Sequence, residues 1–83
     1  MRVGTVTGPV WATKKCAALT GQILLRVASE GKECIAADLV GAGQGDRVIL
    51  CFGGAARLSG RDTPIDAAII GILDETEAAR GGL

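Results

Sequence analysis

Three glycines at alternating positions, Gly41, Gly43 and Gly45, follow an apolar segment and are the first candidates for chemistry. A glycine-rich turn after a strand binds dinucleotides when it has the spacing G-x-G-x-x-G and opens a helix. Here Asp46 stands at the sixth position, where its charge would repel a pyrophosphate, and a segment with strand character follows. The loop also lacks the Lys-Ser/Thr pair that ends a P-loop. The pattern therefore predicts a tight turn or a close subunit contact, and no cofactor.

The three cysteines, Cys16, Cys34 and Cys51, are the candidate nucleophiles. A thiol attacks a substrate when a base or a positive neighbour favours its thiolate form, and the chain contains no His. Cys34 and Cys51 fall in segments with strand character, where buried cysteines behave as small hydrophobic residues. Cys16 follows Lys14 and Lys15 and is the most plausible reactive thiol, although an inert loop cysteine is the simpler interpretation. We predict no catalytic residue.

Four aspartates, Asp38, Asp46, Asp66 and Asp74, lie near predicted strand ends or turns. Carboxylates at such positions usually accept hydrogen bonds from backbone amides or pair with arginine. Asp38 has the strongest claim to a special role because it lies in an apolar strand just before the glycine loop, and Arg57 is a candidate partner for it or for a neighbouring subunit. Without His or clustered carboxylates, no metal site is predicted.

Short apolar segments separated by glycine-rich or charged turns predict a small all-β barrel or sandwich. We expect five strands, over residues 2–13, 22–28, 33–40, 47–52 and 65–74. Gly8-Pro9 interrupts the first strand and predicts a bulge or a sharp bend, because proline cannot donate to the ladder. A helical turn is expected over 55–58, and the tail 75–83 is expected to be a short helix or frayed.

The segment 65–74 is ambiguous. Thr63-Pro64 would make a reasonable helix start, but the run Ile69-Ile70 followed by Gly71 favours a strand. Both faces of that strand are apolar. A strand buried on both faces in so small a domain predicts cover from elsewhere, most simply from a partner subunit.

Composition also points to association. The chain has 83 residues, enough for one domain, and 48% of them are hydrophobic, with a mean hydropathy of +0.37. Its apolar runs fall far short of the roughly 20 residues that a membrane-spanning helix needs, and its first residues lack the apolar core of a secretory signal. The odd number of cysteines predicts a reduced, cytosolic protein. We expect the excess apolar surface to face other copies of the chain, and no membrane.

Charge argues against a nucleic-acid partner. Nine basic and nine acidic residues give a net charge of +0, and the basic residues are scattered rather than clustered on one face. The aromatic residues are Trp11 and Phe52, too few for a base-stacking platform. An OB-type oligonucleotide-binding module remains the alternative, because it shares the predicted barrel. A lone Trp11 is more typical of a core or interface anchor than of a ligand platform.

Five sequence patterns in order resemble the EutN/CcmL family of bacterial microcompartment vertex proteins, and they span Met1 to about Asp74. They are Val3-Gly4-x-Val6-x-Gly8-x-Val10-Trp11-Ala12-Thr13-Lys14, Leu19-Thr20-Gly21-Gln22-Ile23-Leu24-Leu25, Ala37-Asp38-Leu39-Val40-Gly41-Ala42-Gly43-Gln44-Gly45-Asp46-Arg47-Val48, Gly53-Gly54-Ala55-Ala56-Arg57, and Pro64-Ile65-Asp66-Ala67-Ala68-Ile69-Ile70-Gly71-Ile72-Leu73-Asp74. The third, with its Asp-x-x-Gly-Ala-Gly-x-Gly-acid pattern, is the most specific. The resemblance implies an OB-like, five-stranded closed barrel over residues 1–74 and a cyclic homopentamer.

The resemblance further implies a structural role without catalysis. Pentamers would cap the corners of a shell in the bacterial cytoplasm whose flat facets are tiled by hexameric shell proteins. A ring of this kind uses a heterologous contact that closes on itself. We expect the glycine loop and the segment 53–57 to contribute to that contact, and Gly43→Val to impair assembly. The expected interface residues are Asp38, Gly41, Ala42, Gly43, Gly45, Gly53, Ala55 and Arg57.

Overall fold

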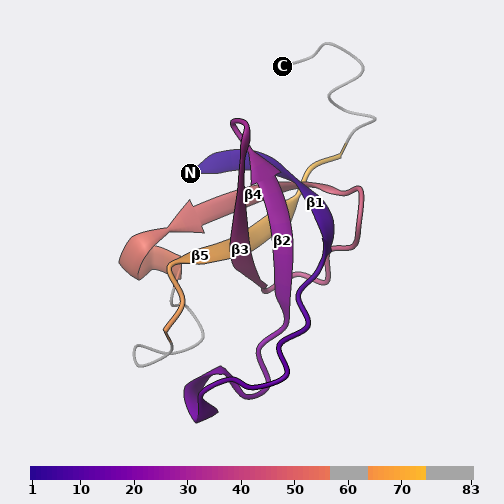
Figure 1. Ribbon diagram of the computed structural model, residues 1–83. Helices are drawn as coiled ribbons and strands as arrows, with labels where there is room; N and C mark the ends of the chain where they lie inside the picture. The colour runs from indigo at the N-terminus through magenta and orange to yellow at the C-terminus, as the bar shows by residue number, and fades with distance from the viewer. Residues whose placement is uncertain (57–63, 75–83) are drawn as a thin grey trace.

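A closed barrel of five strands forms the domain in the computed structural model, which describes residues 1–56 and 64–74 (Figure 1). The order of strands around the barrel is β1-β2-β3-β5-β4, with one parallel pair, β3 and β5. The strands are β1 (Arg2–Pro9), β2 (Leu24–Ser29), β3 (Lys32–Asp38), β4 (Arg47–Phe52) and β5 (Ala67–Ile72). The predicted fold class and all five predicted strands are confirmed, including the strand at the ambiguous segment 65–74.

Alternating side chains fill the barrel. On β4, Val48 and Leu50 are fully buried and point inward, while Ile49 between them is half-buried on the outside. This period of two follows from the pleat of a strand, which sends successive side chains to opposite faces. The inner cluster consists of Val6, Leu25, Val27, Ala36, Val48, Leu50, Ala67 and Ile69.

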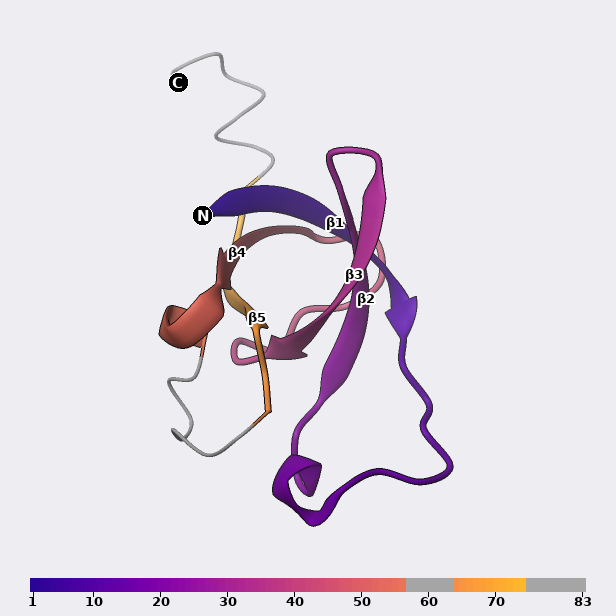
Figure 2. The same ribbon diagram turned by 60° about the vertical axis from the view of Figure 1, so that its left-hand side comes forward.

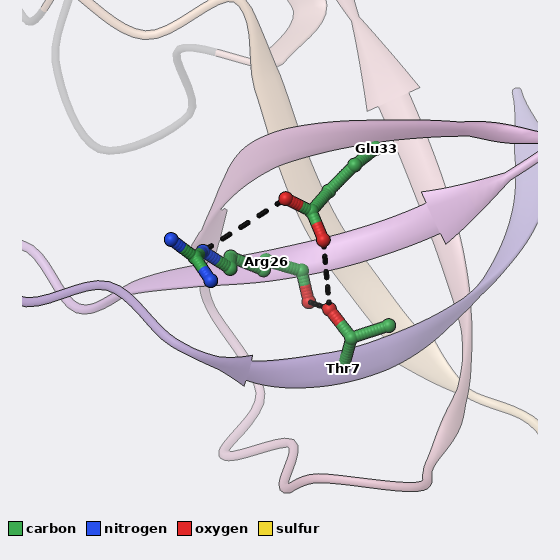
Figure 3. A network of polar contacts seen from close by, with 3 residues as sticks. All are labelled: Thr7, Arg26 and Glu33. Atoms are coloured by element: carbon green, nitrogen blue, oxygen red, sulfur yellow. Dashed lines mark hydrogen bonds and ion pairs between the residues drawn. The ribbon is translucent and has the colours of Figure 1, made fainter.

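The first strand contains the predicted bulge. Val6 pairs with Val27 and Gly8 pairs with Arg26, so Thr7 is the extra residue on β1. The Thr7 hydroxyl lies 3.3 Å from the Arg26 carbonyl oxygen and 3.4 Å from a carboxylate oxygen of Glu33 (Figure 3). The strand ends at Pro9, four residues before the predicted end at residue 13, because the chain turns away from β2 after the bulge.

A two-residue turn joins β2 to β3. Glu30 and Gly31 both have positive φ angles, +54° and +77°, as a type I′ hairpin requires. The hydroxyl of Ser29, at the end of β2, donates a hydrogen bond of 2.9 Å to the Val3 carbonyl oxygen on β1. The tip of the hairpin is therefore tied to the neighbouring strand.

Part of the outer face of β5 is covered by the chain itself. Ala68 points outward yet is fully buried, in a second cluster that lies outside the barrel. The members of this cluster are Ala37, Cys51, Ala56, Ile65 and Ala68, with Leu19, Leu24 and Ile70 packed against them. The expectation that a partner subunit covers this face is therefore wrong for Ala68.

Two 3₁₀ turns complete the described chain. One, η1 (Ala17–Leu19), lies in the long connection between β1 and β2, and the other, η2 (Gly53–Ala56), follows β4 directly. The helical turn predicted over 55–58 thus begins two residues earlier, and its last two residues lie outside the described part of the chain, as does the tail 75–83. Within residues 1–56 and 64–74, no helix has both the length and the apolar character needed to cross a membrane.

Candidate functional site

The glycine loop, residues 41–46, begins with a carboxylate that organises the backbone. Asp38 ends β3, and its Oδ1 accepts hydrogen bonds from the amides of Val40 (3.1 Å), Gly41 (3.0 Å) and Ala42 (3.1 Å). Gly41 has a φ of +81°, a backbone conformation that residues with a side chain rarely adopt. The predicted bonding of an aspartate to backbone amides is confirmed at Asp38.

A second carboxylate closes the loop. Asp46 Oδ2 accepts a hydrogen bond of 2.8 Å from the Gly43 amide, and the Asp46 amide donates one of 3.0 Å to the Gly43 carbonyl oxygen. Gly45, between them, has a φ of +92°. Its amide donates to the Val6 carbonyl oxygen on β1 at 2.8 Å, so the loop is fixed to the barrel wall.

These contacts exclude the dinucleotide hypothesis for the loop. A phosphate-binding loop presents free amides to an anion at the start of a helix. Here the carboxylates of Asp38 and Asp46 already accept from four amides of residues 40–43, and strand β4 follows. The loop is a tight turn within the subunit, which was one of the two predictions from the sequence; the other was a close subunit contact.

Two of the expected interface residues in the loop, Ala42 and Gly43, have different surroundings within the subunit. Ala42 is half-buried and packs against the inner cluster, so part of its side chain faces its own barrel. Gly43 is exposed and does not have a positive φ, and a Cβ atom placed on it would meet one atom within 4 Å, Asp46 Oδ2 at 3.9 Å. Gly43 is therefore the loop glycine that the conformation of the subunit does not require.

The second expected interface segment lies at the other end of β4. Gly53 opens η2 with a φ of +69°, and its amide donates a hydrogen bond of 2.9 Å to the Asp66 carbonyl oxygen. Ala55 lies within η2, and Arg57 lies outside the described residues, as does its expected pairing with Asp38. The strand β4 separates the loop from η2, and Figure 1 shows them on opposite sides of the barrel. The structure does not bring the two segments together within one subunit.

The thiols occupy three different environments. Cys16 is exposed in the β1–β2 connection, Cys34 is half-buried on β3, and Cys51 is buried on β4. Burial, followed by the negative charge of Asp66, raises the pKa of the Cys34 thiol above its ordinary value. Cys34 and Cys51 therefore lie in strands, as predicted, but only Cys51 is buried, and the raised pKa of Cys34 favours its thiol form over the thiolate.

An apolar groove crosses the outer face of the barrel near η1. Leu24, Ile35, Ala37 and Ile65 are among its lining residues, and Asp66 is the charged residue among them. In the described part of the chain, no three His, Cys, Asp or Glu side chains lie close enough to share a metal ion. The groove has the character of a packing surface rather than of a site that moves protons or electron pairs.

The sequence prediction was wrong about the extent of the β1–β2 connection, which is longer than expected. The second strand was expected to begin at residue 22, but β2 begins at Leu24, and Ile23 before it is 62% exposed. Trp11 is 88% exposed, which rules out the core position that was one of its two interpretations. The early proline at position 9 was the available signal that the strand pairing stops there.

Comparison with known proteins identifies a consistent set of relatives. A family model described as ethanolamine utilisation protein EutN/carboxysome matches residues 1–74. The chain is 42% identical over 86 residues to the bacterial microcompartment shell vertex protein GrpN of Rhodospirillum rubrum (strain F11), which covers 93% of this chain and 97% of that protein. It is 41% identical over 83 residues to the carboxysome shell vertex protein CcmL of Thermosynechococcus vestitus, with 89% and 84% covered.

A solved structure shares the fold as well. The pentameric microcompartment shell protein GrpN from Rhodospirillum rubrum superposes with a TM-score of 0.82 at 41% sequence identity. The superposition covers 89% of this chain and 94% of that one. The likeness therefore extends over almost the whole length of both chains.

Proposed function

The chain belongs to the ethanolamine utilisation protein EutN/carboxysome family, and from that premise we propose that it is a structural shell protein of a bacterial microcompartment. Its homopentamers cap the vertices and allow the polyhedral shell to close. The observation that carries the proposal is the match in fold and sequence to a pentameric shell protein over 89% of the chain.

The role is geometric and involves no catalysis. A flat sheet of hexameric shell proteins cannot close on itself, and a pentamer at each corner introduces the curvature that closure needs. The protein therefore works in the bacterial cytoplasm, within the shell, beside hexamers of the same microcompartment. The names of the relatives, which describe shell vertex proteins, support this placement.

A ring of five identical subunits needs two different patches on each subunit, one for each neighbour. The glycine loop and the segment that begins at Gly53 lie at opposite ends of β4. We assign them to the two flanks of the subunit, so that the flank of one copy faces the opposite flank of the next. The positive φ angles at Gly41 and Gly45 favour glycine there, whereas nothing within the subunit requires a glycine at position 43. A close approach by the neighbouring subunit would supply one.

Native mass spectrometry of the purified full chain tests the proposed function. A dominant species of five subunits is expected. A monomer at micromolar concentration would refute the vertex role, and a hexamer would move the protein from the corner of the shell to the facet.

Gly43 variants test the loop contact separately. We expect Gly43→Val to lose the pentamer while keeping the subunit folded, because the space around Gly43 is open within one chain. Gly43→Ala is the matched control for size and is expected to weaken assembly less. Normal rings from Gly43→Val would remove the loop from the interface and leave the pentameric role untouched.

A mixture with a hexameric shell protein of the same organism tests the remaining partner. Closed particles are expected in electron micrographs when both proteins are present, and open sheets or tubes when this chain is left out. Closed particles without it would contradict the vertex role.

A further inference from the structure

The connection between β1 and β2, residues 10–23, extends away from the barrel (Figure 2). It is held at its two ends, where the Val10 amide donates to the Leu24 carbonyl oxygen (3.2 Å) and the Asp38 amide donates to the Ile23 carbonyl oxygen (2.8 Å). Within the described residues, no hydrogen bond joins the stretch 11–15 to the barrel. Leu19 in η1 packs against the outer cluster around Ala68, so the stretch 11–15 is the part of the loop with little support from its own subunit.

The loop exposes two large apolar side chains. Trp11 is 88% exposed and Ile23 is 62% exposed, and both line one pocket between the two limbs of the loop, together with Val10, Ala12 and Leu24. A tryptophan hides roughly 150–250 Å² when it is buried. That area is about a quarter of the roughly 800 Å² that each partner contributes to a stable interface of standard size.

A second copy of this chain is the occupant that the observations favour. The barrel interior and the outer cluster around Ala68 are both complete within one subunit, so neither needs Trp11. The solved relative that shares 41% of its sequence with this chain is a pentamer. A pentamer must bury apolar surface between its copies, and tryptophan is among the residue types that contribute most to such contacts.

We propose that Trp11 and Ile23 form an anchor that is buried against the adjacent copy of this chain in the ring. The inference rests on the proposed pentameric function and deepens it, because it names the side chains that hold the ring together. Truncation of an anchor of this kind weakens each contact by about 30-fold or more.

The fluorescence of Trp11 reads this burial directly, because the chain has one Trp and no Tyr. The experiment uses the purified full chain at a concentration where native mass spectrometry reports its assembly state. In the pentamer we expect blue-shifted emission and acrylamide quenching several-fold weaker than in the urea-unfolded chain. A pentamer whose Trp11 is quenched as in the unfolded chain overturns the anchor and leaves the vertex function standing. A monomer with exposed Trp11 overturns both.

Variants complete the test. Trp11→Ala is expected to shift the chain from pentamer to monomer at concentrations where the wild type is assembled, and to keep its barrel because Trp11 contributes little to the subunit core. Lys15→Ala, which alters a polar residue lining the same pocket, is the matched control and is expected to assemble normally. An unchanged pentamer from Trp11→Ala would refute the anchor. Protection of Trp11 that develops after a hexameric shell protein is added, and not before, would refute it in favour of a contact between the corner and the facet.

Discussion

Gly4 is the position where a single methyl group should damage the barrel most clearly. It lies in β1 on the inner face, and a Cβ atom there would be 2.6 Å from Val27 Cγ1, 2.9 Å from the Ala28 carbonyl oxygen and 3.2 Å from Leu50 Cδ1. Val27 and Leu50 are completely buried, so neither side chain has free space to move into. The Ala28 oxygen belongs to the backbone of β2, which pairs with β1 at Thr5.

Two effects of Gly4→Ala oppose each other. Replacing a glycine reduces the conformational freedom of the unfolded chain and stabilises the fold by about 0.4–1 kcal/mol where the new residue fits. Overpacking a filled core costs about 1–3 kcal/mol. Contacts at 2.6 and 2.9 Å, one of them to backbone, put Gly4 in the second case. We expect a net loss of about 1–2 kcal/mol, and a domain of this size loses roughly 4–8 °C in Tm for each kcal/mol.

Gly8→Ala is the matched control for this experiment. Gly8 lies in the same strand, but a Cβ atom on it would meet no atom within 4 Å and its φ is not positive. Thermal unfolding of both variants should be followed at one protein concentration, with native mass spectrometry to show that their assembly states agree. A Gly4→Ala protein that melts at or above the temperature of Gly8→Ala would refute the close-packing argument.

Three further outcomes are expected. Glu30→Asn should raise the urea midpoint by an amount equivalent to about 0.5 kcal/mol, because Asn tolerates the positive φ of +54° better than Glu does. The ion pair of Glu30 with Arg2 is exposed, so its loss should cost little. A lowered midpoint would contradict this expectation. Asp38→Ala should lower the free energy of unfolding, measured in urea, by about 1–3 kcal/mol. Asp38→Asn keeps an acceptor oxygen and should lower it by less. Equal losses would show that the three hydrogen bonds from backbone amides are not what Asp38 contributes to stability. Thiol labelling at pH 8, mapped by mass spectrometry, should modify the exposed Cys16 first and the buried Cys51 last. Cys34 should react slowly because burial raises its pKa. A Cys34 that reacts as fast as Cys16 would contradict that order.

Local pattern was sufficient to predict the strands. The alternation of Val48, Ile49 and Leu50 fixes which side chains enter the barrel, since a strand has a period of two, and the structure agrees. The bulge was also predictable, because proline cannot donate to the ladder, and the irregularity at Thr7 comes directly before Gly8-Pro9. These features depend on residues that are close in sequence.

The end of the first strand and the start of the second depend on contacts that the sequence does not display. Ile23 continues the alternation of Leu25 and Val27, so its pattern predicts a buried position. The last residue pair between the two strands is Pro9 with Leu25, and beyond it the chain separates into the 10–23 loop. Ile23 therefore has the sequence of a core residue and the surroundings of a surface residue.

The glycine loop shows why an interface is harder to predict than a turn. Asp38, Gly41, Gly45 and Asp46 all have a purpose inside one subunit, either as acceptors for amides or as residues with positive φ. A monomer with the same turn would need the same residues, so their pattern identifies the turn and carries no information about a neighbour. Gly43 is different, since the fold of the subunit gives no reason for a glycine there. A residue that its own chain does not explain is the better guide to a contact between chains, and assembly of Gly43→Val measures whether that guide is right.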